Sequence, residues 1–258
     1  MPNLSLLKIM AKWMKLNKIL YAFCILFLSS LVNAENKVIR LTSLEWPPYS
    51  GKDLPQQGSS VAIARKAFAA MGYTLEVTFF PWSRAVALAK DKNSQFAGYF
   101  PEYYAQDTAE QFIYSKEIGS GPLGFAERID NSISWSTLSD LAPYDIGIVQ
   151  DYINTKDFDV LARSNALTTS ITINDTNNLK KLVSSRIDLA VVDKNVMEYL
   201  FTTDPSLMRK AHLAQFNKQL LEEKKLYICF KKTERGQQYS ELLSQGLQQI
   251  SVDNNNNK

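Results

Sequence analysis

Short apolar segments alternate with segments of helical periodicity along most of the chain. The apolar segment 38–43 is followed by a helical pattern in which Val61, Ala64 and Phe68 share one face, and Gly72 ends it. The same alternation continues to residue 250. It predicts an α/β fold rather than an all-helical protein or a β-sandwich.

The pattern places each element along the chain. Strands are predicted at 38–43, 74–80, 96–100, 123–127, 144–149, 167–173, 187–192 and 226–231. Helices are predicted from Ser59 or Ser60 to 71, and at 82–89, 155–163, 175–183, 195–201 and 234–250, with Asp175 as one N-cap. The tail 251–258 contains four consecutive asparagines and nothing to bury, so we expect it to be disordered.

The first 34 residues have the pattern of an export signal. They carry four lysines and no acid, and an apolar run at 19–32 precedes small residues that end at Ala34. This order predicts a secretory signal peptide that is cleaved after Ala34, and therefore an exported protein. An uncleaved membrane anchor is the alternative, but the run is short for a helix that needs about 20 apolar residues to span a bilayer. Met14 would also begin a well-formed signal, so the start codon stays open between Met1 and Met14.

Removal of this segment changes the charge. The whole chain of 258 residues has 29 basic and 26 acidic residues. The signal takes four lysines with it, which leaves 25 basic residues against 26 acidic ones and a net charge of −1. The remaining balance gives no reason to expect a nucleic acid or an anionic membrane as partner.

Cysteine and histidine are scarce. The sequence contains one histidine, His212, and two cysteines, Cys24 and Cys229, of which Cys24 leaves with the signal. These counts argue against a His/Cys metal site and against a disulfide framework. Cys229 lies in an apolar run and is expected to be a small buried hydrophobe, whereas His212 lies in a polar stretch and is expected at the surface. We therefore expect no metal site, and the function inferred below adds the expectation of no cofactor and no catalytic residues.

The pattern breaks at 119–122, and 123–127 is expected to be an extended crossing segment between two series of strands and helices. Such an arrangement predicts two lobes with a cleft between them. Ligands on α/β scaffolds bind at the carboxyl ends of the strands, so the cleft is the expected site.

Several short motifs appear in a particular order along residues 38–250. Together they resemble the periplasmic solute-binding proteins of family 3, the type II two-lobed receptors that include polar amino-acid-binding proteins. The motifs are Trp46-Pro-Pro-Tyr49, the helix at 60–72, Phe80-Pro-Trp-Ser-Arg84, Phe112-Ile-Tyr-Ser115 and Asp188-Leu-Ala-Val-Val-Asp193.

The resemblance implies an α/β, two-lobed periplasmic-binding-protein type II fold with a hinge and an interlobe cleft. Its N-lobe would comprise 35–121 plus 230–250, and its C-lobe 122–229. It also implies a monomer that closes around a small-molecule ligand and delivers it to an inner-membrane ABC permease. A membrane-bound sensor is the other partner that the resemblance allows.

The chain departs from the family at its anion-binding positions. The position of the family's carboxylate-binding arginine is occupied by Thr108, and the family's Gly-Thr anion cradle by Asp151-Tyr152. Threonine cannot replace the two-pronged contact of an arginine with a carboxylate. Asp193 falls where the family places its acceptor for the ligand α-ammonium group, and Arg84 is the candidate anion contact that remains.

The residues themselves predict an acidic, aromatic cleft. The aromatic candidates are Trp46, Tyr49, Trp82, Tyr99, Tyr103, Tyr104 and Tyr152, and the acidic ones are Glu102, Asp151 and Asp193. Aromatic faces combined with carboxylates suit cationic or ring-bearing ligands. Tyr103 and Tyr104 are adjacent, so at most one of them is expected to face the cleft.

Each candidate also has a purely structural interpretation. Asp193 could only cap the following helix, Trp46 and Trp82 could only pack in the core, Arg84 could be a solvated helix charge, and Asp151-Tyr152 could form a turn before the helix at 155.

The function expected from these observations is solute binding without chemistry. The ligand would be small, polar and amino-acid-like, with cationic and aromatic groups as candidates. Two alternatives belong to other classes: an input domain for a membrane sensor, and a dehydratase-like enzyme on the same scaffold with Glu102 and Asp193 as an acid–base pair. The sequence contains no nucleophile–base set that would favour the enzyme.

Overall fold

The computed structural model describes residues 37–256. The predicted signal at 1–34, including Cys24, lies outside the described residues. From Val38 onward the chain forms one compact unit. Within the described part of the chain, no helix is both long and apolar enough to cross a membrane.

The first lobe is built on a mixed sheet. Its strands are β1 (Val38–Ser43), β2 (Thr74–Phe79), β3 (Gly98–Glu102), β4 (Phe112–Tyr114) and the last part of β9 (Ala214–Lys231). Strand β1 lies parallel to β2 and β3, and β9 runs antiparallel to β3 and β4. The helices of this lobe are α2 (Ser59–Ala70), α3 (Trp82–Lys90), α4 (Gln106–Gln111) and α9 (Glu234–Asn256), and α2 packs on α9.

The second lobe repeats the arrangement on another sheet. Its strands are β5 (Gly119–Arg128), β6 (Asp145–Val149), β7 (Thr168–Thr172), β8 (Leu189–Asp193) and the first part of β9, in the order β9-β5-β8-β6-β7. Its helices are α5 (Lys156–Arg163), α6 (Asp175–Leu182), α7 (Lys194–Thr203) and the short α8 (Pro205–Met208).

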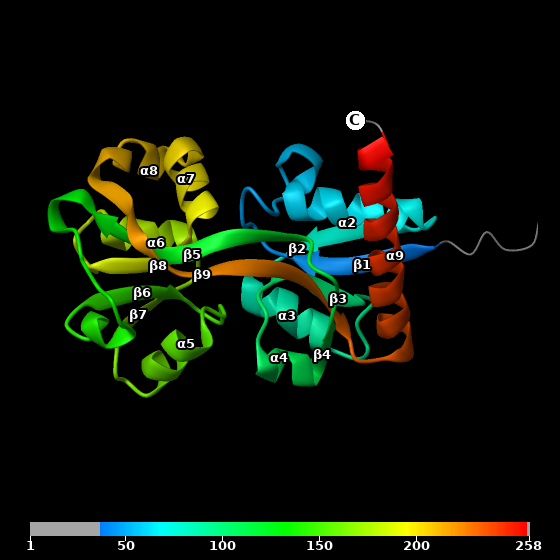
Figure 1. The fold of residues 1–258 in the computed structure, drawn as a ribbon, viewed down its shortest axis with the longest axis horizontal. Helices are drawn as coiled ribbons and strands as arrows, with labels where there is room; N and C mark the ends of the chain where they lie inside the picture. The colour runs from blue at the N-terminus through cyan, green and yellow to red at the C-terminus, as the bar shows by residue number, and fades with distance from the viewer. Residues whose placement is uncertain (1–36, 257–258) are drawn as a thin grey trace, which may run out of the picture. The chain divides into compact units, whose positions relative to one another are not determined.

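Two long strands connect the lobes. Strands β5 and β9 pair antiparallel from Gly119↔Leu226 to Arg128↔Ala214, and they cross side by side between the two lobes (Figure 1). A pair of extended strands is a narrow connection about which lobes can rotate. The fold therefore supplies the predicted hinge.

The start of β9 is the largest difference from the predicted elements. The pattern indicates a strand only at 226–231, whereas β9 begins at Ala214. Residues 215–225 carry mainly polar and charged side chains, so their apolar pattern is weak. They form a strand because β5 satisfies their main-chain groups, a partner that local periodicity cannot reveal.

Two predicted helix caps are wrong in detail. The N-cap of α2 is Gly58, with φ of 101°, rather than Ser59 or Ser60. The N-cap of α6 is Asn174, whose side-chain oxygen accepts a hydrogen bond from the Asn177 N–H at 2.9 Å. Asp175 is therefore the first residue of α6, and its carboxyl group is buried.

Helix α9 continues past the predicted end at residue 250. It reaches Asn256, so 251–256 are helical where the sequence predicts a disordered tail. No glycine or proline follows Gly246 to interrupt the helix.

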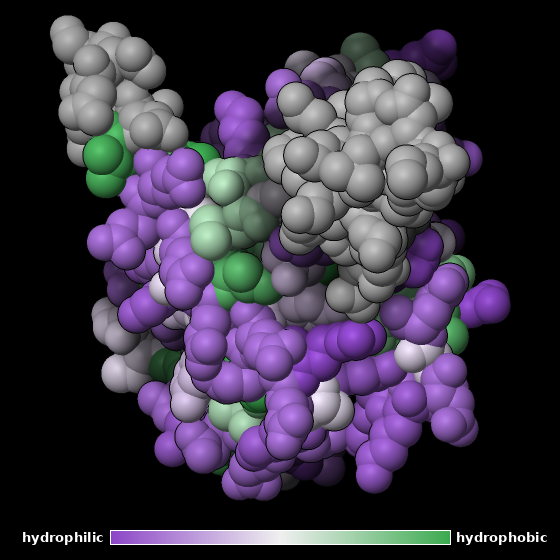
Figure 2. Space-filling view, turned by 90° about the vertical axis from the view of Figure 1, so that its right-hand side faces the viewer, coloured by the Kyte–Doolittle hydropathy of each residue, from purple (hydrophilic) through white to green (hydrophobic). Residues whose placement is uncertain are grey.

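Each lobe has an apolar core under its helices. Phe68 and Phe230 pack edge to face in the first lobe, and Phe125 and Phe158 lie together in the second, all four with no exposed surface. Cys229 is likewise fully buried and free, and His212 is exposed, as predicted. From the side that carries α9, the described surface is mostly polar (Figure 2).

Candidate functional site

The segment after β1 brings two aromatic rings to the contact between the lobes. Trp46 and Ser50 form an isolated bridge that folds the loop back on itself, with the Trp46 N–H donating to the Ser50 carbonyl at 2.8 Å. This tight turn stacks the rings of Trp46 and Tyr49 with their centroids 4.7 Å apart. Both residues are only 6% exposed, so the loop presents a rigid aromatic surface.

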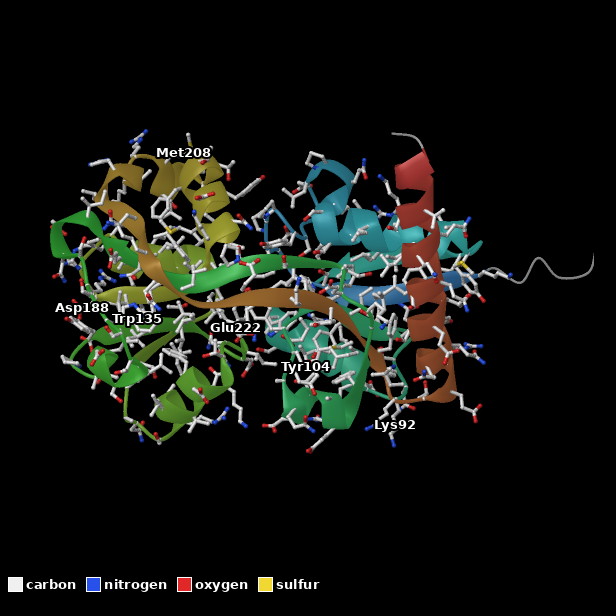
Figure 3. The ribbon with its side chains drawn as sticks, viewed as in Figure 1. Lys92, Tyr104, Trp135, Asp188, Met208 and Glu222 are labelled. Carbon is white, nitrogen blue, oxygen red and sulfur yellow. The ribbon has the colours of Figure 1, made fainter. Side chains whose placement is uncertain are left out.

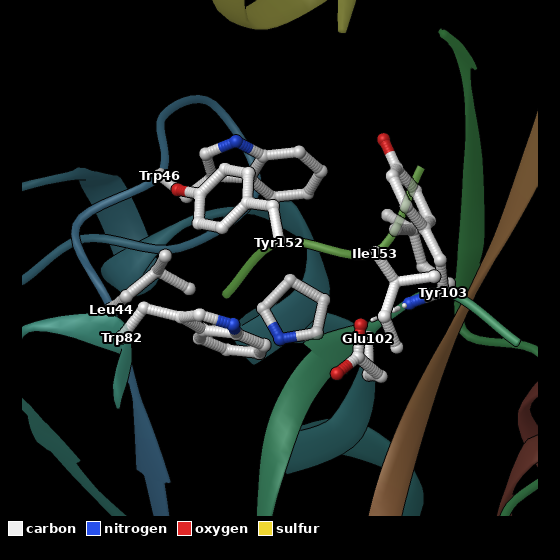
Figure 4. A pocket seen from close by; sticks show the side chains of 9 residues that line it. Leu44, Trp46, Trp82, Glu102, Tyr103, Tyr152 and Ile153 are labelled. Atoms are coloured by element: carbon white, nitrogen blue, oxygen red, sulfur yellow. Dashed lines mark hydrogen bonds between the residues drawn. The ribbon is translucent and has the colours of Figure 1, made fainter. Parts of the chain in front are cut away.

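A small cavity of about 20 Å³ lies between the lobes. Trp46, Trp82 and Tyr152 lie on one side of it, and Glu102 and Tyr103 on the other (Figure 4). The remaining lining residues are Leu44, Pro101, Ile153 and Leu226. Sites for small ligands usually measure about 300–1,000 Å³, so a solute can enter only if the lobes move apart.

A neighbouring cavity of about 10 Å³ shares Trp46, Tyr103 and Tyr152 with the first. It adds two carboxyl groups, those of Asp175 and Asp193. The two cavities together therefore present aromatic rings and three acidic side chains, including Glu102, at the meeting point of the lobes.

Asp193 is the N-cap of α7 and also lines the smaller cavity. As the N-cap of α7 it accepts hydrogen bonds from the N–H groups of Asn195 (2.8 Å) and Val196 (3.2 Å). Its carboxyl oxygens also lie 3.1 Å from the Tyr49 hydroxyl of the other lobe, which donates to them. Burial raises the pKa of Asp193 to about 6, although its hydrogen bonds act in the opposite direction.

Asp175 is an acidic site residue that sequence analysis missed. It is 5% exposed and accepts a hydrogen bond from the Tyr152 hydroxyl at 3.2 Å. Burial, together with the negative charge of Asp193, raises its pKa to about 7 against the lowering effect of the Tyr152 hydrogen bond. From the sequence, Asp175 was interpreted as the N-cap of its helix. In the structure Asn174 is the N-cap, so the carboxyl group of Asp175 is available to the cleft.

Glu102 ends β3 and is 6% exposed. It accepts hydrogen bonds from the Tyr103 N–H at 2.8 Å and from the Tyr99 hydroxyl at 3.1 Å. Burial raises its pKa to about 8, against the lowering effect of these bonds and of the nearby Lys224 ammonium.

Lys224 on β9 is a second residue that the sequence did not indicate. It is 5% exposed, and its ammonium lies 5.3 Å from the centre of the Tyr103 ring and 3.5 Å from a carboxylate oxygen of Glu222. Its place on a connecting strand puts a positive charge beside Glu102. The sequence did not indicate Lys224 because it lies in the first part of β9, before residue 226, where no strand was predicted.

A second contact between the lobes involves Trp82 and Asp151. The Trp82 indole N–H donates to the Asp151 carbonyl at 3.0 Å, and the Ser83 hydroxyl donates to the Asp151 carboxylate. The ring of Trp82 also meets Tyr152 edge to face, with centroids 6.0 Å apart. Asp151 itself is exposed and has a φ of 61° in its turn. Asp151 therefore bridges the lobes, and Tyr152 lines the cavity.

Several candidates lie away from the cavity. Arg84 is exposed, and its guanidinium lies 5.2 Å from the Phe80 ring centre. Tyr104 is 51% exposed, so Tyr103 is the one of the pair that faces the cleft. Tyr99 is 1% exposed and supports the site through Glu102. Thr108, at the position of the family's arginine, is a residue of α4, and its side chain lies beside that of Tyr114 on β4.

Gly121 on β5 allows the Tyr49–Asp193 contact to form. A Cβ atom at this position would lie 2.1 Å from both the Asp193 Oδ2 and the Tyr49 hydroxyl oxygen. Any larger residue would displace one of these groups, so the contact depends on glycine in the connecting strand.

No protein-family model matches the sequence. No curated protein is similar to it in sequence either. Solved structures do match. An ancestral arginine-binding protein bound to arginine shares 14% identity over 84% of this chain and 94% of its own, with a TM-score of 0.69.

Two other solved structures extend the comparison. A histidine kinase sensor domain with similarity to periplasmic binding proteins has 17% identity and a TM-score of 0.73, over 86% of this chain and 94% of its own. The GluR0 ligand-binding core from Nostoc punctiforme in complex with L-glutamate has 14% identity and a TM-score of 0.67, over 84% of this chain and 94% of its own.

The chain has the two-lobed periplasmic-binding-protein fold. The fold predicted from the resemblance to family 3 is thereby confirmed. In a two-lobed periplasmic-binding-protein fold, two lobes that rotate about connecting strands can enclose a small molecule. Here the enclosed region holds aromatic rings and buried carboxyl groups from both lobes, and among the described residues no group of acidic, cysteine or histidine side chains is arranged to hold a metal ion.

Proposed function

We propose that this protein is an exported binding protein that closes its two lobes around a small organic cation. The observation that supports the proposal is the pair Asp175 and Asp193, two buried carboxyl groups that face the same ring-lined cavity. A cation placed between them would be attracted by both carboxylates where water cannot solvate them. The faces of Trp46 and Tyr152 would add cation–π attraction.

The anion-binding side of the cleft is weak by comparison. Thr108 carries no charge, and Arg84 lines neither cavity; the buried Lys224 lies over the Tyr103 ring and is not among the lining residues. Lysine offers a point charge rather than the two-pronged geometry of arginine. We therefore infer an organic cation, with or without a carboxylate, in preference to an acidic amino acid.

Closure follows from differential affinity. Tyr49 comes from the first lobe and Asp193 from the second, so a ligand held beside both gains its full contacts only when the lobes meet. The closed form would then deliver the solute to an inner-membrane ABC importer, with the ligand chemically unchanged.

A thermal-shift screen of the protein at pH 8 tests this proposal. The panel pairs cations (arginine, lysine, putrescine, choline) with anions (glutamate, aspartate, aromatic acids). A ligand at ~1,000 times its Kd adds about 4 kcal/mol, and each kcal/mol moves the midpoint by roughly 2–4 °C. We expect large shifts from cations, whereas shifts from acidic amino acids alone would contradict the proposal.

The matched control is Asp193→Asn. Asparagine keeps an acceptor for the N–H groups of α7 and removes a buried charge, so at pH 8 the unliganded midpoint should not fall, whereas the cation-induced shift is lost. Mass spectrometry of the recovered ligand adds a second readout: a modified ligand would favour the enzyme alternative.

An input domain for a membrane sensor is the second candidate. The solved sensor domain of a histidine kinase, which shares this fold over most of both chains, favours it. The cleft would bind the same class of ligand in either case. Co-purification of the protein with an importer permease or with a sensor kinase in cross-linked membranes separates the two functions.

A further inference from the structure

A groove runs along the outer edge of the second lobe, away from the cleft residues. It has a volume of about 640 Å³ and lies between strand β7, helix α6 and the segment that follows α8. Its lining residues are Ile171, Thr172, Ile173, Asn177, Lys180, Lys181, Ser184, Arg186, Ser206 and Lys210.

The groove is strongly basic. Lys180, Lys181, Arg186 and Lys210 line it, and the described lining contains no carboxylate. None of these four cations takes part in an ion pair found among residues 38–256. The carboxylate of Asp204, the N-cap of α8, interacts electrostatically with Lys180, and it also accepts a hydrogen bond from the Ser206 N–H. The groove therefore concentrates positive charge on a protein whose exported form is expected to be nearly neutral.

Strand β7 is also an open edge of its sheet, since among residues 37–256 it pairs only with β6. The Gln150 N–H donates to the Thr172 carbonyl at 2.8 Å, so the main-chain groups of Thr172 face β6. Those of Ile171 and Ile173 must then face outward, because the direction alternates along a strand. The Lys181 ammonium donates to the outward Ile171 carbonyl at 3.1 Å, which confirms this direction.

Apolar side chains accompany the open edge. Ile171 is 61% exposed and Ile173 73% exposed. Met208 on α8 is also 50% exposed, but it lies at the top of this lobe in Figure 3 and is not among the residues that line the groove. Exposed isoleucines beside an unpaired strand edge are unusual on a protein surface, because such edges pair readily with other chains.

The geometry points to this groove as a docking site for an extended acidic segment of a partner protein, which adds as a strand beside β7. Main-chain groups of the segment would pair with Ile171 and Ile173. Its carboxylates would meet the four cations, and its apolar side chains would cover the two isoleucines. Lys181 would release the Ile171 carbonyl and bind a carboxylate instead. A small inorganic anion would use only the cations, and a flat anionic bilayer would not enter a groove.

Nuclear magnetic resonance titration of the 15N-labelled protein tests the inference. The probe is a soluble peptide of about eight residues that alternates glutamate with valine or threonine, and its counterpart has lysine in place of each glutamate. We expect the acidic peptide to shift the amide signals of 168–173 with a Kd of about 1 mM or tighter, more weakly at high salt. The lysine peptide should shift none of them.

Charge reversal supplies the variant and its control. The double variant Lys180→Glu/Lys210→Glu should raise the Kd of the acidic peptide at least about tenfold. Lys52→Glu/Lys116→Glu makes the same change in net charge on exposed lysines of the first lobe and should leave binding unchanged.

Several results would overturn the inference. They are equal binding of both peptides, amide shifts that fall on the cleft instead of β7, and no binding of the acidic peptide at all. Pyrophosphate or phosphatidylglycerol vesicles that bind the groove while the peptide does not would also overturn it. None of these outcomes depends on a ligand in the cleft.

Discussion

The interlobe cleft and the basic groove both collect charges of one sign, but they differ in burial. In the cleft, Glu102, Asp175 and Asp193 are nearly inaccessible to water, and burial raises the pKa of each carboxyl group. In the groove, Arg186 and Lys210 are exposed, so water solvates their charges. The comparison teaches that desolvation, more than the number of like charges, decides whether a charged cluster must be neutralised.

The largest expected effect is the dependence of stability on pH. The pKa values of Asp193, Asp175 and Glu102 are raised to about 6, 7 and 8, above those of an unfolded chain. Between the unfolded and folded pKa values, the folded state holds more protons than the unfolded state. The free energy of unfolding should therefore fall by a few kcal/mol in total as pH rises from about 5 to 8.

Urea unfolding across this pH range measures the effect. The double variant Asp175→Asn/Asp193→Asn should flatten the dependence, because it removes two of the titrating groups. Lys180→Gln in the groove should leave the slope unchanged. A free energy of unfolding that rises with pH in the unaltered protein would show that these carboxyl groups are ionised in the folded state.

The second effect concerns ligand affinity. Asp193→Asn should weaken the binding of an organic cation by about 2–3 kcal/mol, or roughly 30- to 150-fold. The charged acceptor is lost, while the cap of α7 remains. Lys180→Gln should change the affinity less than about twofold, since it alters only the groove. Isothermal titration calorimetry at pH 8 compares the two variants, and equal losses in both would remove the distinction between the regions.

Gly121→Ala comes next. Its Cβ atom would collide with the Asp193 carboxylate and the Tyr49 hydroxyl, so the closed arrangement should be destabilised by on the order of 2 kcal/mol. Small-angle X-ray scattering with saturating ligand should then give a larger radius of gyration. Ser120→Ala on the same strand is the control, and an unchanged radius in Gly121→Ala would show that the strand shifts to accept the methyl group.

The smallest effect is expected at the second interlobe contact. Trp82→Phe keeps an aromatic ring at the cavity but loses the hydrogen bond to the Asp151 carbonyl, which should cost about 1 kcal/mol of ligand affinity. Arg84→Gln, two residues away and exposed, should have no effect on the same titration. If both variants bind alike, Trp82 contributes to the cavity only through its ring.

Most of the fold could be predicted, since β1, β2, α2 and α7 follow directly from apolar periodicity. The first part of β9 could not, because its polar residues become a strand only through pairing with β5. For the two cavities, the sequence indicated Trp46, Tyr103, Tyr152 and Asp193 but missed Asp175, and it also missed the buried Lys224 over the Tyr103 ring. These two residues carry no local signal: the first was interpreted as a helix cap, and the second lies in the unpredicted segment of β9.

The sequence by itself determined the alternation of strands and helices, the buried Cys229, and the absence of an arginine at position 108. These properties depend on residue type and on near neighbours along the chain. Only the tertiary structure decided which carboxyl groups lose their water. Asp193 ends β8 and Asp151 lies two residues after β6, yet Asp193 is buried against Tyr49, 144 residues away, while Asp151 stays exposed. Desolvation depends on everything that packs around a group, and at this site that packing comes from two lobes.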